Sequence, residues 1–413
     1  MSAPLAVPLP ALMAHRPFAL FWWARVSATA AFQMQAVAIG WQVYELTGSA
    51  FDLGLIGLVM FVPVVVLALA VGHVADRYDR RLVVRACQLV EGLAAAALAI
   101  GSAGGWLTAA SIFVIVLLIG TARAFELPAL QALLPALVPP ASFSRAVAGS
   151  TSANQTAIIV GPAIGGIIYL VGPAAVYATC SAIFVGAGVL VTLIRVDLLI
   201  AERKPVSLES LFAGIAYIRG RRALLGIISL DLFAVLLGGA TALLPIYARD
   251  ILVSGPWGLG LLRSAPAVGA LATSIVLASR PMRHRVGHIM FAAVALFGVA
   301  TMVFAVSQSF ALSLAALIVL GAADATSVVI RFSLIQIATP DGMRGRVSAV
   351  NSLFVGTSNT LGEFESGVTA AWFGVVPAVL IGGIGTVLVA LLWLRWFPEL
   401  ARVDGLEPTP SEN

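Results

Sequence analysis

Between two long apolar runs of the chain lies a charged decapeptide, GHVADRYDRR at residues 72–81. The apolar runs on either side span residues 51–73 and 83–102. Each has about the 20 residues that a helix needs to cross the hydrocarbon core of a bilayer. Short arginine-bearing turns between such runs are typical of a membrane surface. These segments therefore predict two spanning helices joined by a tight polar turn.

The composition of the whole chain indicates the same environment. Of its 413 residues, 60% are hydrophobic and 10% charged, and the mean hydropathy is +1.03. Soluble proteins carry about 25% charged residues, because their surface faces water. This chain has too little charge to cover such a surface, so lipid must be the solvent for much of it. We predict an all-α membrane protein.

The apolar runs predict twelve spanning helices in two bundles of six. Residues 196–222 form the longest polar stretch and divide the chain. We therefore expect a cytoplasmic tail at 1–17, a first bundle at 18–195, a cytoplasmic linker at 196–222, a second bundle at 223–396 and a cytoplasmic tail at 397–413. The expected spans are 18–45, 51–73, 83–102, 106–129, 147–171, 174–195, 223–247, 257–279, 288–306, 309–337, 347–370 and 373–396.

The positive residues set the expected orientation. With both termini in the cytoplasm, the cytoplasmic loops and tails hold 19 of the 24 Lys and Arg residues, and the opposite side holds only Arg249 and Arg263. This is the distribution that the positive-inside rule favours. The arginines lie in separate short loops rather than in one patch, which argues against nucleic-acid binding. The two cysteines, Cys87 and Cys180, fall inside apolar runs and are expected to be small buried residues.

The two halves resemble each other at a constant offset. At an offset of 203, Gly57 matches Gly260 and Pro63 matches Pro266. At an offset of 201, Gly120 matches Gly321, and further matches follow in sequence order. Two similar halves around a central site are a common construction in secondary transporters.

The decapeptide resembles the signature loop of the major facilitator superfamily, G-x-x-x-D-R-x-G-R-R. Asp79 stands where the pattern usually has glycine. The resemblance implies a loop that latches the two halves in one conformation, with its first acid as the switch. An ordinary membrane-surface loop with a solvated acid is the alternative. The matching residues are Gly72, Asp76, Arg77, Arg80 and Arg81.

A second stretch resembles the antiporter motif of the same superfamily, G-P-x-x-G-G in helix 5. It consists of Gly161, Pro162, Gly165 and Gly166. Proline kinks a helix, and glycines let helices approach closely. The resemblance favours export over uptake, while simple helix packing is the alternative.

The chain also resembles a narrower bacterial branch, the one that contains the enterobactin exporter. This likeness is carried by ELTGS at 45–49, by Leu244-Pro245 and by TPDGMRGRV at 339–347. Members of the branch export siderophores or drugs, and a related branch flips lysophospholipids. The substrate does not transfer with the resemblance.

Charged side chains inside spans are the candidates for a site, because each costs several kcal/mol unless it is paired or hydrated. The superfamily fold implies that eight of the nine such charges lie on helices lining the central cavity. The ninth, Glu91, is expected to be structural. Together with the polar Gln33, the cavity and proton-coupling candidates are Arg25, Arg123, Glu126, Asp231, Asp324, Arg331, Glu363 and Glu365.

Asp231 is the first choice for a proton-titrating group, because its own helix offers no nearby cation. Arg123 and Glu126 are three residues apart on one helix and can neutralise each other. Arg25 either snorkels to the interface or belongs to a polar face. Glu363 and Glu365 point about 200° apart on a helix, so at most one faces the cavity.

The sequence offers no enzyme chemistry. The single lysine, Lys204, follows Arg203 rather than glycine, so no P-loop is present and ATP does not drive this chain. His284 and His288 lie among arginines without an acid between them, which indicates a basic loop rather than a metal site.

We therefore expect a proton-driven exporter of a small organic molecule, siderophore or drug-like, that works by alternating access. It is expected to act as a monomer in the bacterial inner membrane, with no cofactor, no metal and no nucleic-acid partner. Its partners would be a small-molecule substrate, protons and the lipid bilayer. The alternatives are a lysophospholipid flippase and a membrane-embedded enzyme or sensor.

Overall fold

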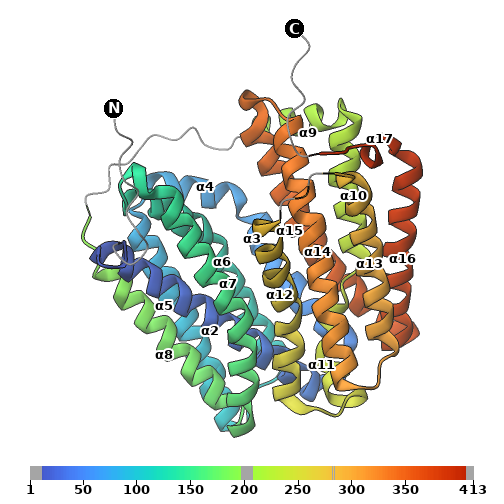
Figure 1. Cartoon of the computed structure of the whole chain (residues 1–413). Helices are drawn as coiled ribbons and strands as arrows, with labels where there is room; N and C mark the ends of the chain where they lie inside the picture. The colour runs from blue at the N-terminus through green and yellow to red at the C-terminus, as the bar shows by residue number, and fades with distance from the viewer. Residues whose placement is uncertain (1–11, 197–207, 281, 283, 406–413) are drawn as a thin grey trace. The chain divides into compact units, whose positions relative to one another are not determined.

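The computed structural model of the chain describes residues 12–196, 208–280, 282 and 284–405, and every regular element in that part is helical (Figure 1). The long helices alternate with short turns. Their bounds are α2 (Arg16–Thr47), α3 (Ala50–Val66), α4 (Ala68–Arg77), α5 (Arg80–Gly104), α6 (Ala109–Leu133), α7 (Phe143–Ile168), α8 (Pro173–Thr192), α9 (Leu208–Arg219), α10 (Arg222–Leu237), α11 (Leu244–Ile246), α12 (Gly255–Ser279), α13 (Val286–Val306), α14 (Phe310–Ala338), α15 (Asp341–Phe373), α16 (Val375–Trp396) and α17 (Pro398–Ala401).

Each of the twelve expected spans coincides with a helix or a broken pair of helices. In the described part of the chain, nine helices are long and apolar enough to cross a membrane. The other three expected spans correspond to α2, to α3 with α4, and to α15. Of these, α3 has only 17 residues and passes into α4 at Leu67, whereas α2 and α15 carry several charged and polar residues.

The expected span 223–247 is also broken. The α10 helix ends at Leu237, directly before Gly238 and Gly239. A Cβ at Gly239 would lie 2.1 Å from the carbonyl oxygen of Gly362, so α15 runs against the bare backbone of this break. A short 3-10 turn, α11 and a π-helical turn (Tyr247–Ile251) complete the crossing. Irregular backbone in a span is tolerated where protein buries it.

The chain forms two compact units. Unit 1 comprises residues 1–48, 59–205 and 255–264, and unit 2 comprises 49–58, 206–254 and 265–413. Each unit therefore includes a short segment from the other half of the sequence. Unit 2 also contains α9, a helix within the segment 196–222, packed against α15 and α10.

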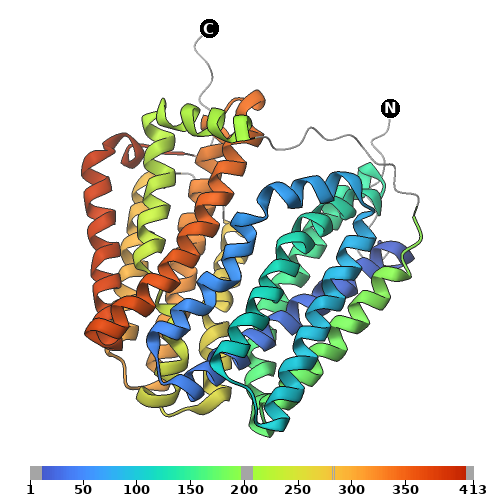
Figure 2. The same cartoon turned by 180° about the vertical axis from the view of Figure 1, so that it is seen from behind.

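In unit 1, α5 and α8 run side by side, as Figures 1 and 2 both show, and α2 packs against α7 and α8. Glycines make these contacts close. A Cβ at Gly165 of α7 would lie 2.7 Å from the Cα of Met34 in α2. Lipid gives helices little hydrophobic drive to associate, so close backbone approach of this kind carries much of the packing.

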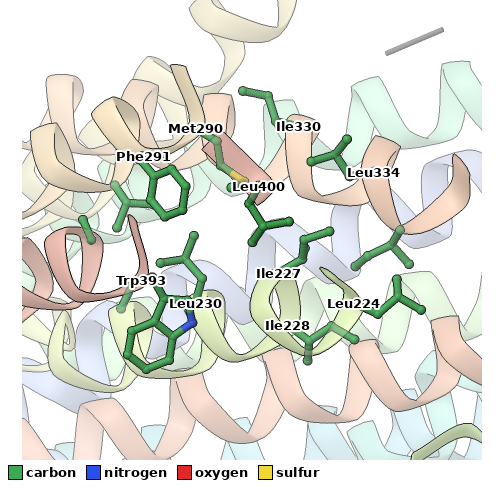
Figure 3. Packing of buried hydrophobic residues seen from close by; sticks show 14 of the residues in the cluster. Leu224, Ile227, Ile228, Leu230, Met290, Phe291, Ile330, Leu334, Trp393 and Leu400 are labelled. Atoms are coloured by element: carbon green, nitrogen blue, oxygen red, sulfur yellow. The ribbon is translucent and has the colours of Figure 1, made fainter. Parts of the chain in front are cut away.

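In unit 2, a cluster of buried apolar side chains holds α10 between α13, α16 and α17 (Figure 3). From α10 it takes Ile227 and Leu230, which meet Phe291, Trp393 and residues of α17. The indole Nε1 of Trp393 also donates to the hydroxyl of Ser229 at 3.0 Å. This packing fixes the rotation of α10 about its axis, and thereby the direction of its polar side chains.

The sequence repeat has a structural counterpart. Gly120 of α6 packs against the backbone of Met60 in α3, where a Cβ would lie 2.4 Å from the carbonyl oxygen. Its match at offset 201 is Gly321 of α14, which packs in the same way against the backbone of Pro266 in α12. A Cβ at Gly321 would lie 1.9 Å from the carbonyl oxygen of Pro266. The two units therefore use equivalent glycines to bring equivalent helices together.

Candidate functional site

Unit 1 contains a cavity of about 220 Å³ between α2, α6 and α7. Its wall combines apolar side chains with a small number of polar and charged groups, as binding cavities usually do. Four of the predicted candidates lie in this wall. The lining residues are Arg25, Ala28, Thr29, Phe32, Gln33, Arg123, Glu126, Leu127, Leu130, Asn154 and Ile158.

Arg123 is the centre of the charged cluster in this unit. Its Nη1 lies 3.4 Å from Oε2 of Glu126 and 3.7 Å from Oε1 of Glu91. Its guanidinium also lies over the ring of Phe32, 3.9 Å from the ring centroid. The expected pairing of Arg123 with Glu126 is therefore present, but the arginine serves two carboxylates rather than one.

The carboxylates of this cluster are buried. Glu91 is 0% exposed and Glu126 1% exposed. Glu126 accepts a hydrogen bond from Nε2 of Gln88 at 3.2 Å. Neither carboxylate oxygen of Glu91 has a hydrogen-bond donor among the described residues. Gln88 and Glu91 come from α5, the helix that the superfamily resemblance places outside the cavity, so the sequence reading left them out of the site.

Arg25 lies in the same wall on α2. Its Nη1 donates to the hydroxyl of Ser150 on α7 at 2.9 Å. One turn further along α2, Thr29 donates to Oδ1 of Asn154 at 2.7 Å. Arg25 and Thr29 therefore share a polar face with Gln33, as the four-residue spacing predicts.

Unit 2 has its own charged cluster, centred on Arg331 of α14. Nη1 of Arg331 forms an ion pair with Oδ1 of Asp231 on α10, and Nη2 lies 3.9 Å from Oδ1 of Asp324. Asp231 is 8% exposed and Arg331 5% exposed. The absence of a cation in its own helix does not leave Asp231 unpaired, because α14 supplies one.

A smaller cavity of about 80 Å³ adjoins this cluster. Ile227 and Asp231 are one turn apart on α10 and line it together, a consequence of the helix rotation set by the apolar cluster. Asn351 and Asn359 of α15 add amide groups that the sequence reading did not select. The lining residues are Ile227, Asp231, Val235, Asp324, Val328, Arg331, Phe332, Ile335, Asn351, Val355 and Asn359.

The two glutamates of α15 lie apart from these cavities. Glu365 accepts a hydrogen bond from the hydroxyl of Thr369 in its own helix at 2.6 Å. Glu363 lies against α3, where a Cβ at Gly57 would be 2.7 Å from its Oε2. Neither lines the two cavities described above. Their different surroundings agree with the expected separation of about 200°.

The signature loop forms the turn between α4 and α5. Of Gly72 and Asp76, the structure describes only the backbone, which is part of α4. Arg77 is exposed at the end of α4. Arg80 donates to the carbonyl oxygen of Ala132 at 3.0 Å. Arg81 donates to the carbonyl oxygen of Ile194 at 3.1 Å. These arginines tie the start of α5 to the C-terminal ends of α6 and α8, where cations are favoured.

Asp79, the departure from the family pattern, caps α5. Its Oδ1 accepts the backbone N–H of Arg81 at 2.9 Å, and its Oδ2 accepts from Nη2 of the same arginine at 2.7 Å. These bonds from Arg81 lower the pKa of the Asp79 carboxyl. The latch acid implied by the resemblance is Asp76, so Asp79 has a separate, local role.

The G-P-x-x-G-G stretch lies in α7 and faces two helices. Gly161 and Gly165 contact α2, with Cβ positions 2.8 Å from Cβ of Gln33 and 2.7 Å from Cα of Met34. Gly166 contacts the segment of α12 that belongs to unit 1, with a Cβ position 2.4 Å from the carbonyl oxygen of Pro256. Pro162 lies inside the helix. The motif therefore brings α7 close to two neighbours.

Within the described residues, no group of three His, Cys, Asp or Glu side chains is placed to hold a metal ion. Both units instead present an arginine close to two carboxylates beside a cavity. Groups of this kind inside spans mark ion and substrate pathways. A multi-span helical fold with such clusters is typical of secondary transporters.

Solved structures and relatives identify the class further. The chain resembles the nucleoside transporter NupG (TM-score 0.74, 14% identity, 92% of this chain and 99% of that chain). It also resembles a bacterial homologue of the iron transporter ferroportin (TM-score 0.72, 16% identity, 92% and 98%). The predicted all-α fold of the major facilitator superfamily is confirmed.

The sequence profile of the transmembrane secretion effector family matches residues 8–412, and the chain belongs to this family of major facilitator transporters. It is 25% identical to the enterobactin exporter EntS of Citrobacter koseri over 409 residues, covering 97% of this chain and 96% of the relative. The identity to EntS of Escherichia coli is also 25%, over 413 residues. The suspected relationship to the enterobactin exporter branch is confirmed, and a transporter rather than an enzyme follows from the family.

Proposed function

We propose that this protein is a proton-driven exporter of a small organic molecule, siderophore or drug-like, working by alternating access. The observation that carries the proposal is the arginine with two carboxylates inside the spans of each unit. Charges there cost several kcal/mol unless they serve a pathway or are compensated. Full-length similarity to enterobactin exporters and the G-P-x-x-G-G stretch support export as the direction.

The ion pair of unit 2 suggests how coupling works. While Arg331 contacts Asp231, the carboxylate is held in its charged form. If a conformational change or a substrate separates the pair, Asp231 loses its counter-ion in a poorly hydrated place and binds a proton. Asp231 is thus the proposed coupling group of this unit, and Asp324 is the second acid within reach of the arginine.

The same proposal includes topology and assembly. The two halves, 18–195 and 223–396, would act as rocking bundles joined by the segment 196–222. Both termini would face the cytoplasm of a bacterium, with the chain a monomer in the inner membrane. The positive-inside distribution supports this orientation.

Transport by purified protein in liposomes tests the proposal. Enterobactin, the substrate named for the relatives, and a set of drug-like cations are supplied with and without a pH gradient. We expect a substrate to move faster under the gradient in wild type. The Asp231→Asn variant should lose the effect of the gradient and retain exchange at equal pH. Transport that ignores the gradient in wild type contradicts proton coupling.

The flippase alternative is tested in the same liposomes. A fluorescent lysophospholipid placed in one leaflet would change leaflets if the protein were a flippase. We expect its rate to equal that of liposomes without protein. Protein-dependent movement of the lysophospholipid, together with no movement of the soluble substrates, would replace the exporter proposal with the flippase.

A further inference from the structure

Two carboxylates and one guanidinium meet in the interior of unit 1, behind the wall of its larger cavity. Glu126 and Arg123 line the cavity, whereas Glu91 does not. Arg123 is 17% exposed through its side chain, against 0% for Glu91 and 1% for Glu126. The order from the cavity inwards is therefore arginine and Glu126 first, and Glu91 behind them.

The charges of this group do not balance if both acids are ionised. One arginine then faces two carboxylates at 3.4 and 3.7 Å, leaving one negative charge in excess in a buried place. Buried charges without full compensation are costly. Two carboxylates that share a site respond by keeping a proton between them. The proton belongs to the pair rather than to one residue.

Hydrogen bonding favours the same state. Glu126 accepts from Gln88 and contacts Arg123, which suits an ionised carboxylate. Both oxygens of Glu91 are buried without a donor from the described residues, and its contact with Arg123 at 3.7 Å is longer than a hydrogen bond. A neutral carboxyl tolerates these surroundings better than a charged one.

The other groups facing the pair leave Glu91 with Arg123 as its contacting cation. Arg25 on α2 faces Glu126 across the cavity, and its charge favours the ionised form of Glu126, while its Nη1 donates to Ser150. Among the described residues, Arg25 forms no ion pair with Glu91. The α8 helix packs on α5 and carries no Asp, Glu, Lys, Arg or His, only the titratable Tyr177 and Cys180. On α5 itself, Cys87 is a buried thiol. At the far end of α4, Arg77 is exposed.

We infer that Glu91 and Glu126 share one proton beside Arg123, and that this pair is a second coupling-proton site, in the unit that does not contain Asp231. The coupling role rests on the proposed function, but the shared proton does not. The proton enters from the cavity at Glu126 and is held by the pair beside Arg123. Its release leaves both carboxylates ionised around Arg123.

The infrared spectrum of the purified protein in lipid nanodiscs tests the shared proton without any transport. At neutral pH, wild type should show the C=O stretching band of a buried protonated carboxylic acid. Each of the variants Glu91→Gln and Glu126→Gln should lose the same band. In each variant a single carboxylate remains beside Arg123, and this arginine compensates its negative charge, so the carboxylate stays ionised. The matched control is Glu45→Gln, an exposed glutamate of α2, which should retain it. A band that neither variant alters, or that only one of them removes, overturns the shared proton.

A further variant distinguishes loss of the shared proton from misfolding of the protein. Arg123→Gln removes the cation, so both acids should be protonated and the band should grow. Purely structural carboxylates, both ionised through other groups, would give no growth. The band should grow in Arg123→Gln and disappear in Glu91→Gln and Glu126→Gln. Misfolding would not produce both of these opposite changes.

Transport measurements then test the coupling role. For a substrate that wild type moves faster under a pH gradient, the transport rate of Glu91→Gln under the gradient should equal its rate at equal pH. Exchange of the substrate at equal pH should continue. Gradient-driven transport by a Glu91→Gln protein that lacks the band overturns the coupling role. Absence of gradient-driven transport in wild type contradicts the proposed function instead, and the infrared result remains interpretable.

Discussion

Arg331 is the residue on which the interior of unit 2 depends. It is 5% exposed and serves Asp231 and Asp324 from one guanidinium. Removing one partner of a buried ion pair leaves the other charge without compensation, which costs about 3–5 kcal/mol. Replacing both partners by neutral groups of similar shape avoids most of this cost.

We therefore expect Arg331→Gln to lower the thermal unfolding temperature in detergent strongly, and the double variant Asp231→Asn with Arg331→Gln to recover most of the loss. The control is Arg395→Gln, an exposed arginine of α16, which should behave as wild type. A double variant no more stable than Arg331→Gln would show that the cost lies elsewhere than in the unpaired aspartate.

Asp79 gives a pH prediction at the same scale. Hydrogen bonds from Arg81 lower its pKa in the folded protein. A lowered folded pKa means that the carboxylate contributes stability above the ordinary pKa of aspartate, about 3.9, and that this contribution is lost as the pH falls through the lowered value. Wild type should therefore lose part of its stability in acid through this group.

Two variants of Asp79 separate the charge from the cap. Asp79→Asn keeps a good N-cap and should lack only the acid-dependent part of the stability. Asp79→Ala should in addition lose the cap, which is worth about 0.5–2 kcal/mol. Thermal unfolding measured from neutral to acid pH distinguishes them. Equal pH profiles for wild type and Asp79→Asn would show that the ion pair with Arg81 contributes nothing.

At the scale of the helix, the contact of α7 with α2 depends on Gly165, which has a hydrogen atom where other residues have a Cβ atom. A Cβ at Gly165 would lie 2.7 Å from Cα and 2.9 Å from the carbonyl oxygen of Met34. These are backbone atoms, so relief requires the two helices to separate. Glycine elsewhere in a helix lowers stability relative to alanine by about 1 kcal/mol.

Gly165→Ala should therefore destabilise the protein by about 1–3 kcal/mol, the usual cost of overpacking. The matched control is Gly186→Ala in α8, where a Cβ would meet nothing within 4 Å. That variant should be neutral or slightly more stable. Thermal unfolding of the two alanine variants makes the comparison, and equal effects would mean that the α7–α2 distance is not limited by Gly165.

At the scale of the whole molecule, the orientation in the membrane is open to a paired labelling test. Tyr78 lies in the turn between α4 and α5 and is 60% exposed, and Trp106 lies in the turn between α5 and α6 and is 55% exposed. Because α5 is a predicted span, these turns should lie on opposite sides of the membrane. The arginines beside Tyr78 predict that its turn faces the cytoplasm.

In a background without Cys87 and Cys180, Trp106→Cys should react with an impermeant thiol reagent in intact cells, and Tyr78→Cys should react only after the cells are opened. Both positions have similar exposure, so a difference reports sidedness rather than burial. Reaction of Tyr78→Cys in intact cells, without reaction of Trp106→Cys, would invert the topology and place both termini outside.

The sequence by itself determined the fold class and most of the charged residues of the candidate site. Membrane spans are readable from a single chain because about 20 apolar residues are required for each, whatever their neighbours. In-span charges such as Arg123 and Asp231 are visible for the same reason, since they interrupt otherwise apolar runs. Repeated glycines such as Gly120 and Gly321 also matched in sequence and in packing.

Only the tertiary structure decided which charges meet. Asp231 has no cation within its own helix, and its partner Arg331 lies 100 residues further along the chain. Glu91 reaches Arg123 only because α5 and α6 pack side by side in one rotational setting. Pairing inside a membrane depends on helix rotation and on distances of a few ångströms, and both are set by side-chain packing around each helix. Local sequence fixes which residues are charged, whereas packing fixes their partners.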